Sequence, residues 1–469
     1  MNRITRRGKT FAAFICALLF LAALVSCEPT AQEDATEKVS PGVSPGAVLI
    51  GSSLALSGHA SYLGRQTLFG AMSYIRHINE TGGVHGRKIE VIAEDDGYDP
   101  PKCVANTQKL IVEDKVFALF CYVGTPTTVK IIPLVEEARI PLVGSFTGAN
   151  ALREPFHRYI INIRASYYQE TAAAVTHLVK DLGLKRIAVF YQYDAYGFDG
   201  LKGAELALKE YGLAPVARGT YVRGTMDVEE GLNRILEAKP EAVIMIGTSA
   251  PCAKLIRLTE ERDSHPPVFY AVSFVGADEI ARILGSSHPA KLIMSQVVPP
   301  PDLPETRTLL WGVVEYSELL KRYYPEERPN TVGLEGYINA KVLVEGLKRA
   351  GPELTRERFI DAIESINNYS VGIANTISFG SNLHQGLERV YFTVLEDGRF
   401  ILITDWDKIK SGVNHLPPGA DAEAASGKAS GGTPGASRGE TLGAVLTPPA
   451  QSPPEREPNG KTAVPKAGG

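Results

Sequence analysis

The stretch VLIGSSLALSGHASYLGRQTLFGAMSYIRHINETGGVHGRKIEVIAE, residues 48–94, decides the fold class. It begins with a short apolar run and continues into residues 65–80, where apolar side chains recur at helical spacing. The glycine pair 82–83 ends this helix, because glycine readily adopts the left-handed cap conformation. A second strand is expected at 88–93. The stretch therefore predicts a strand–helix–strand unit.

The same alternation continues along the chain. Further helices are expected at 104–113, 129–138, 170–182, 200–211, 228–238 and 252–261. Further strands are expected at 116–121, 140–144, 186–191, 215–220, 242–246 and 268–271. Regular alternation predicts parallel sheets with helices on both faces. Because the units are too many for one ordinary sheet, we predict an α/β fold of two doubly wound lobes.

The N-terminal segment has the features of a secretory signal. Basic residues up to Lys9 precede an apolar run at 11–24, and a small residue, Ser26, precedes Cys27. The run is shorter than the roughly 20 residues of a membrane span, although an uncleaved anchor remains the alternative. Leu-Val-Ser-Cys at 24–27 resembles the bacterial lipobox. This resemblance implies a signal peptide over 1–26, acylation of Cys27 and a lipid-tethered protein in the periplasm or cell envelope.

Polar segments flank the predicted lobes. Residues 27–46 contain Pro-Gly twice, which is typical of a tether. Of the 59 residues from 411 to 469, 20 are Gly or Pro, and we predict disorder because so few apolar groups cannot offset the ordering entropy. The formal net charge is −4, which gives no reason to expect nucleic-acid binding.

Cysteine usage permits one disulfide at most. Of the five cysteines, Cys16 belongs to the signal and Cys27 to the lipid, which leaves Cys103, Cys121 and Cys252. An oxidising compartment allows a disulfide, and we predict Cys103 with Cys121. Buried free thiols are the alternative.

Hydroxyl-rich loops with glycine follow several predicted strands in the first half of the chain. They are Leu-Ser-Gly-His-Ala at 56–60, Gly-Thr-Pro-Thr-Thr at 124–128 and Ser-Phe-Thr-Gly-Ala at 145–149. In open α/β sheets, ligands bind beyond the carboxyl ends of the strands. Free N–H groups at a helix start attract an anion such as a carboxylate, although Ser and Thr there also act as ordinary N-caps. Convergence of these loops on one sheet edge predicts a carboxylate site.

Several motifs together carry a family resemblance. The strongest is Ile-Asn-Glu-Thr-Gly-Gly-Val-His-Gly-Arg-Lys-Ile at 78–89, accompanied by Leu-Ser-Gly at 56–58, Glu-Asp-Asp at 94–96 and Tyr-Asp-Ala-Tyr-Gly at 193–197. Over residues 47–410 the chain resembles the type I periplasmic solute-binding proteins, specifically the Leu/Ile/Val-binding branch that serves ABC importers. The resemblance implies two lobes joined by three crossovers, with the solute trapped between them by hinge closure.

The resemblance also implies where the lobes divide. The crossings are expected near 162–165, 296–300 and 378–386. The first lobe would then comprise 47–163 and 299–378, and the second lobe 164–298 and 379–410.

The ligand-binding residues follow from the same resemblance. They are Ser57, Gly58, Thr125, Ser145 and Thr147 in the first lobe, and Tyr196, Thr248 and Ser273 in the second. The resemblance implies that the hydroxyl residues of the first lobe hold a carboxylate and that Tyr196 closes over the solute.

Ser273 and Thr248 depart from the family pattern. The family's amino-acid binders place a glutamate at the position of Ser273, to pair the α-ammonium, and an aromatic residue at that of Thr248. A buried ammonium without a carboxylate is costly, which weighs against a simple α-amino acid unless Asp194 or Asp278 supplies the charge. We therefore predict a small carboxylate-bearing solute, either an amino acid or a related organic acid or amide.

Arg164, at the expected first crossing, has two interpretations. Its guanidinium is suited to clamping a second carboxylate, and equally to a structural ion pair at the hinge. The neighbouring tyrosines 167, 168, 191, 193 and 196 are suited either to stacking on a solute or to packing. Asp95, Asp96 and Asp99 fit turn and cap roles better than a Ca²⁺ site, which needs six or more oxygen ligands.

No catalytic motif favours an enzyme. The sequence contains no Gly-x-Ser-x-Gly elbow, Walker loop or His-Glu-x-x-His zinc motif. We expect a monomeric solute-binding protein without cofactor or metal, whose partners are the solute and an ABC permease. A sensory receptor that passes its closed state to a signalling partner is the alternative.

Overall fold

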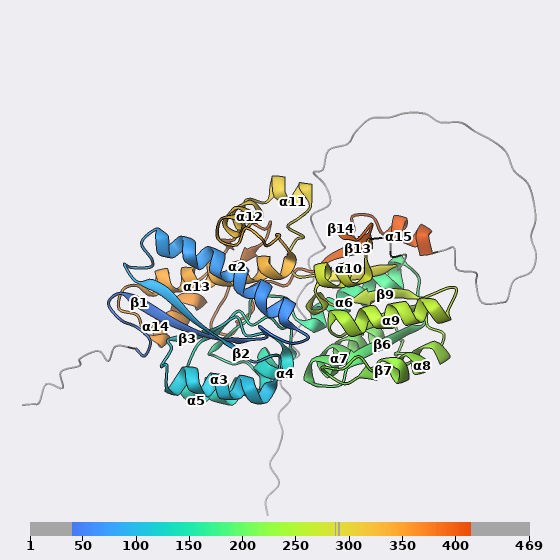
Figure 1. Cartoon of the computed structure of the whole chain (residues 1–469), viewed down its shortest axis with the longest axis horizontal. Coiled ribbons are helices and arrows are strands. Elements are labelled where there is room, and N and C mark those ends of the chain that lie inside the picture. The colour runs from blue at the N-terminus through green and yellow to red at the C-terminus, as the bar shows by residue number, and fades with distance from the viewer. Residues whose placement is uncertain (1–39, 287, 289–290, 414–469) are drawn as a thin grey trace, which may run out of the picture. The chain divides into compact units, whose positions relative to one another are not determined.

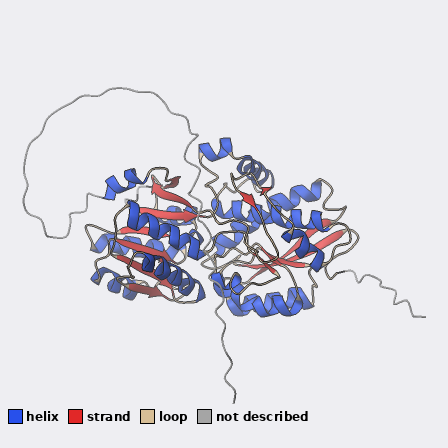
Figure 2. Ribbon diagram, turned by 180° about the vertical axis from the view of Figure 1, so that it is seen from behind, coloured by secondary structure: helices blue, strands red, loops and turns tan. Residues whose placement is uncertain are grey.

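The computed structural model describes residues 40–286, 288 and 291–413. Two parallel-sheet cores, each covered by helices on both faces, form the described chain (Figures 1 and 2). The predicted fold class is thus confirmed. The predicted signal peptide, the lipidation residue Cys27 and nearly all of the predicted C-terminal tail lie outside the described residues.

The first sheet has the strand order β2-β1-β3-β4-β5, and all of its neighbours are parallel. Its strands are β1 (Ala47–Leu54), β2 (Lys88–Asp95), β3 (Ala118–Phe120), β4 (Leu142–Val143) and β5 (Ile160–Ile161). The helices between them are α2 (Ser61–Glu80), α3 (Pro100–Val112), α4 (Thr125–Thr128), η1 (Val129–Ile131), α5 (Ile132–Ala138) and η2 (Asn150–Leu152). The single helix expected at 129–138 is broken into short pieces, because Pro126 and Pro133 each begin a new turn.

The second sheet has the strand order β14-β13-β10-β9-β8-β6-β7. Its strands are β6 (Ile187–Gln192), β7 (Arg218–Tyr221), β8 (Ala242–Ile246), β9 (Val268–Ala271), β10 (Leu292–Gln296), β13 (Tyr391–Glu396) and β14 (Arg399–Leu402). Its helices are α6 (Tyr167–Thr176), the π-helical turn η3 (His177–Asp181), α7 (Ala195–Glu210), α8 (Glu229–Glu237), α9 (Ser249–Arg262), η4 (Ser273–Val275), α10 (Ala277–Leu284) and α15 (Trp406–Val413). The last two strands are antiparallel, an extension of the sheet that strand–helix alternation does not predict.

In the described part of the chain, the backbone passes between the two sheets three times. It crosses after β5, again after β10, and finally before β13. The first and last crossings run side by side, since the Asn162 N–H donates to the His384 carbonyl at 2.8 Å and the Leu387 N–H to the Ile163 carbonyl at 2.8 Å. This backbone pairing gives the hinge a defined position.

Between the second and third crossings the chain returns to the first lobe. The elements there are α11 (Pro304–Leu309), α12 (Trp311–Tyr323), α13 (Thr331–Ala350), α14 (Arg356–Glu364), β11 (Tyr369–Ser370) and β12 (Thr376–Ile377). Helix α13 packs closely on α2. A Cβ at Gly336 would lie 2.1 Å from the Thr67 carbonyl oxygen, so glycine is required where these helices touch.

The ends of the globular part differ from the sequence-based expectation. Residues 40–46 do not behave as a tether, because Val43 bridges Val48 and the Lys88 N–H donates to the Gly46 carbonyl at 2.8 Å. Helix α15 ends at Val413, so the first residues of the predicted tail belong to a helix. Among the described residues, no helix is long and apolar enough to cross a membrane.

The predicted disulfide between Cys103 and Cys121 is absent. Both cysteines, and Cys252, are buried free thiols. Cys121 lies toward α13, with its Sγ 3.5 Å from Asn339 Nδ2, whereas Cys103 packs in a separate apolar cluster around Leu110. The two thiols therefore belong to different core layers, which sequence proximity does not reveal.

Candidate functional site

Aromatic rings from both lobes pack into one cluster beyond the carboxyl ends of the strands. Phe274 lies at the centre, with its ring centroid 5.9 Å from that of Tyr98, 5.8 Å from Phe146 and 4.7 Å from Tyr196. Tyr167 joins through Tyr196 at 5.2 Å. All of these side chains are buried. We call them the interlobe aromatic cluster; Tyr98 and Phe146 belong to the first lobe and the others to the second.

Three of the predicted first-lobe residues lie beside this cluster. The hydroxyls of Thr125 and Thr147 are hydrogen-bonded to each other at 2.7 Å, and that of Thr147 also donates to the Tyr167 hydroxyl at 3.4 Å. Ser145 is equally buried, but its Oγ has no hydrogen-bond partner among the described residues. Ser145 therefore has hydrogen-bonding capacity that the described part of the protein does not use.

Ser57 and Gly58 lie apart from the buried cluster, on an exposed loop. The loop is held by Asp95, whose Oδ1 accepts the N–H groups of Leu56 at 2.9 Å and Ser57 at 3.1 Å. Burial raises the pKa of Asp95, but hydrogen bonds from Ser57, Gly97 and Leu56 outweigh it and leave the pKa below its usual value.

The other acidic residues after β2 also have turn and cap roles, as predicted. Asp96 accepts the Tyr98 N–H at 2.8 Å, and Asp99 caps α3 by accepting the Lys102 N–H at 3.1 Å. Within the described ranges, no group of three potential His, Cys, Asp or Glu ligands is placed to hold a metal ion.

The second lobe contributes a chain of hydroxyl and amide groups. Tyr196 donates to the Gly247 carbonyl at 3.1 Å, and the Thr248 N–H donates to the Tyr221 hydroxyl at 2.9 Å. Tyr221 in turn donates to Gln192 Oε1 at 2.9 Å, and Gln192 Nε2 reaches the Tyr98 hydroxyl of the first lobe at 3.5 Å. Gln192 and Tyr221 belong to the candidate site and were missed from the sequence. Gln192 ends β6, whose following loop was considered, whereas Tyr221 ends β7, whose following loop was not.

The carboxylate beside Ser273 comes from Glu170, which the sequence analysis also missed. The Ser273 N–H donates to Glu170 Oε2 at 2.8 Å and the Ser273 hydroxyl to Oε1 at 2.9 Å. Neither Asp194 nor Asp278 takes this role. Asp194 caps α7 and pairs with Arg223, and Asp278 lies exposed on α10.

Arg164 lies buried at the first crossing, between carboxylates of both lobes. Its Nη2 contacts the Ser273 hydroxyl and lies 3.3 Å from Glu170 Oε1, and its Nη1 lies 3.5 Å from Glu335 Oε2. The guanidinium carbon sits 4.8 Å from the centroid of Phe146. Burial opposes its charge, but Glu335 and Glu170 outweigh burial, so the pKa of Arg164 is raised. The interpretation of Arg164 as a structural ion pair at the hinge is confirmed.

Glu335 is the weaker acid of this group. Burial raises the pKa of Glu335 to about 7, against the opposing effect of the Arg164 charge. Glu335 therefore holds a proton over much of the weakly acidic range.

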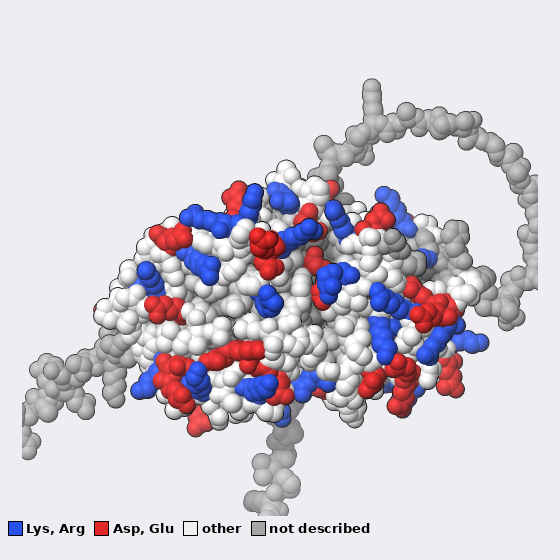
Figure 3. All heavy atoms as spheres, in the orientation of Figure 1, with Lys and Arg blue, Asp and Glu red and all other residues white. Residues whose placement is uncertain are grey.

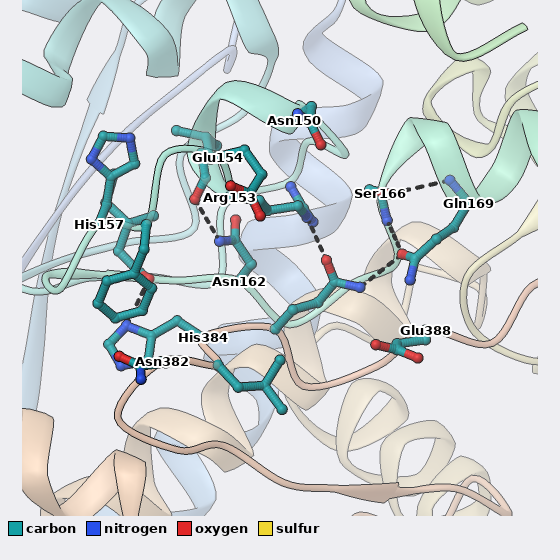
Figure 4. Close-up of a pocket in the computed structure, with 15 residues that line it drawn as sticks. Asn150, Arg153, Glu154, His157, Asn162, Ser166, Gln169, Asn382, His384 and Glu388 are labelled. Carbon is teal, nitrogen blue, oxygen red and sulfur yellow. Dashed lines mark hydrogen bonds between the residues drawn. The ribbon is translucent and has the colours of Figure 1, made fainter. Parts of the chain in front are cut away.

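A pocket of about 260 Å³ lies behind the hinge, where the first and last crossings meet (Figure 4). Arg153 Nε donates to Gln385 Oε1 at 2.6 Å, and Gln385 Nε2 donates to Gln169 Oε1 at 2.7 Å. None of the predicted ligand-binding residues lines this pocket. Its side chains mainly bond one another, which is expected of a hinge support.

Comparison with known proteins identifies the family. The family model described as "Periplasmic binding protein" matches residues 47–399. The chain belongs to the periplasmic binding proteins. The crystal structure of a possible leucine/isoleucine/valine-binding protein from Rhodopirellula baltica is 35% identical, with a TM-score of 0.72, over 77% of this chain and 97% of that one.

Two further similar proteins are named for amino acids. An amino acid binding protein from Pseudomonas aeruginosa is 25% identical over 53% of this chain and 66% of that protein, just under two thirds of its length. A branched chain amino acid ABC transporter structure from Thermus thermophilus with bound valine shares the fold, at 20% identity and a TM-score of 0.69 over 78% of this chain and 99% of that one. The resemblance to the Leu/Ile/Val-binding proteins is confirmed. These are solute-binding proteins and not enzymes.

Proposed function

We propose that this periplasmic binding protein is the lipid-anchored receptor of an ABC importer and captures a small carboxylate-bearing solute by closure of its lobes. The interlobe aromatic cluster carries the proposal, because it joins rings and polar groups of both lobes at the edge where α/β sheets bind ligands. Relatives named as amino acid binding proteins support an amino acid or a related organic acid or amide.

In this proposal Ser145, Thr125 and Thr147 receive the carboxylate. The Ser145 hydroxyl, which has no partner among the residues that the structure describes, supports this assignment, since a buried hydroxyl without an acceptor or donor is costly. Ser57 and Gly58 would meet the solute first, at the exposed rim, and Tyr196, Thr248 and Ser273 would close on it from the second lobe.

The carboxylate site is tested by isothermal titration of Thr147→Val against the amino acids and organic acids that shift the melting temperature. Valine keeps the shape of threonine and removes the hydroxyl. Thr259→Val is the matched control, because Thr259 is equally buried but donates to the Leu255 carbonyl of its own helix at 2.7 Å. We expect about a tenfold loss of affinity in the first variant only. If Thr147→Val bound the solute as tightly as Thr259→Val, the proposed carboxylate site would be wrong.

Membrane attachment is tested separately at Cys27. Cys27→Ser is expected to move the protein from the membrane fraction into the soluble periplasmic fraction, because acylation requires the thiol. A variant that stays in the membrane fraction would contradict the lipid anchor.

A further inference from the structure

We propose that the solute is a carboxylic acid without an α-ammonium group, that its body is apolar or aromatic, and that Arg164 receives its carboxylate. This rests on the proposed function and names the chemical class of its solute.

Glu170 has no capacity left for a solute ammonium. Its oxygens accept from the Ser273 N–H, the Ser273 hydroxyl and, at 2.5 Å, the Ser295 hydroxyl, and Arg164 Nη2 lies 3.3 Å from Oε1. A carboxylate offers about four lone-pair sites, so these donors fill it. Glu170 is also completely buried. The carboxylate that stands beside Ser273 is therefore already neutralised by the protein's own cation.

Arg164, in contrast, has guanidinium N–H groups that form no hydrogen bond with the described residues. These are the buried Nε and Nη1 groups, of which Nη1 lies within ion-pair distance of Glu335, 3.5 Å from its Oε2. Arg164 itself is only 3% exposed, so water does not readily satisfy these groups. Buried donors without acceptors are unfavourable, and an incoming carboxylate would satisfy them with charge-assisted hydrogen bonds.

The guanidinium of Arg164 lies beside the loop where a carboxylate is expected. The guanidinium stacks on Phe146, which lies between Ser145 and Thr147 in the chain, and it also lies 5.9 Å from the ring of Tyr167. The Ser145 hydroxyl is a second buried group without a partner in the described part of the chain. Within the described residues, two Arg164 nitrogens and the Ser145 hydroxyl that lack hydrogen bonds thus flank one aromatic ring.

The charge around Arg164 favours an anion and opposes a second cation. Glu335 lies 3.5 Å from Nη1, but burial raises its pKa to about 7, so its negative charge is easily removed by a proton. Glu170 and Glu335 both pair with Arg164, and protonation of Glu335 leaves Glu170 as the remaining counter-charge. A solute ammonium would be buried beside a guanidinium without a free carboxylate, which is strongly unfavourable.

The walls of the site determine the body of the solute. Tyr98, Phe146, Tyr167, Tyr196 and Phe274 are each at most 1% exposed and present ring faces and edges to one another. Opening of the lobes would separate the rings of the two lobes and leave apolar, planar surfaces. Such surfaces are suited to an apolar chain or an aromatic ring.

The test uses pairs of solutes that differ only in the ammonium group. Isothermal titration of the purified full-length protein compares 3-phenylpropanoate with phenylalanine, and 4-methylpentanoate with leucine. We expect the acid of at least one pair to bind about tenfold or more tightly than its amino acid. The amide 3-phenylpropanamide, which has no charge, is expected to bind more weakly than the acid.

Tighter binding of the amino acids would overturn this inference and leave the proposed function intact. Failure of every acid and amino acid to bind would overturn both.

The role of Arg164 is tested with Arg164→Lys, which keeps the charge but loses the planar donor set. Arg356→Lys is the control, because Arg356 is half-buried and its guanidinium donates to the backbone carbonyls of Phe117 and Ala138 in the first lobe. We expect acid affinity to fall about tenfold in the first variant only; an unchanged preference for acids in folded Arg164→Lys would refute the assignment.

Discussion

Arg164→Met removes the cation that joins the carboxylates of the two lobes. Glu170 would lose the nearest cation, 3.3 Å away, while Glu335 would lose its partner at 3.5 Å. Leaving a buried charge without its partner typically costs about 3–5 kcal/mol. Loss of the contact with Phe146 adds about 1 kcal/mol. Protonation of Glu335, whose pKa is about 7, reduces the penalty for leaving its charge buried without a partner. We therefore expect Arg164→Met to lower the free energy of unfolding by about 3 kcal/mol at neutral pH, the lower end of this range.

The assay is urea denaturation of the ligand-free protein, followed by far-ultraviolet circular dichroism. A double-mutant cycle with Glu335→Gln measures how much of the cost belongs to that pair. Because Glu335 is already easily protonated, Glu335→Gln alone should cost about 1 kcal/mol or less, and the double variant should be less destabilised than the sum. A cost below about 1 kcal/mol for Arg164→Met would refute the reasoning, because the buried ion network would then contribute little.

Other predictions follow from single contacts. The pKa of Glu335 is about 7 in the folded state and near 4.5 in the unfolded state. Between these values the folded state retains a proton that the unfolded state loses. The free energy of unfolding should therefore fall by about 3 kcal/mol as the pH rises from 4.5 to above 7. Urea denaturation at pH 5 and 8 should show this pH-dependent difference in the free energy of unfolding for the wild type and not for Glu335→Gln. Gly124→Ala would place a Cβ 2.0 Å from the Tyr98 ring, at a φ of +95°, and should weaken solute binding measured by calorimetry. Gly336→Ala should destabilise the fold by about 1–3 kcal/mol or more, because its Cβ would meet helix α2. The loss is measured as a lower melting temperature. Gly46→Ala, which meets nothing within 4 Å, is the control for both glycine variants, and equal effects would contradict the packing argument.

The sequence by itself determined the α/β fold class and indicated the sheet edge at which we propose the site. Buried parallel strands are short apolar runs, and the helices that cover them have a regular apolar spacing, so both are visible locally. The loops after β3 and β4 were identified for the same reason, and Thr125, Ser145 and Thr147 lie together there. Family motifs then indicated three crossings of the chain.

Only the tertiary structure decided which charged groups meet inside the candidate site. Ser273 is joined to Glu170 and Arg164 to Glu335 across long stretches of chain, and these contacts depend on how α6 and α13 are rotated against the sheets. The antiparallel strands β13 and β14 likewise complete a sheet that begins far earlier in the chain.

The unpaired cysteines and the exposed Ser57 have the same explanation. Cys103 and Cys121 point into different core layers, and Ser57 is held at the rim by Asp95. Local patterns record which residues are buried or begin a helix, because periodicity and capping depend on near neighbours. They do not record which distant side chains become partners, because that is determined by the packing of whole elements against one another.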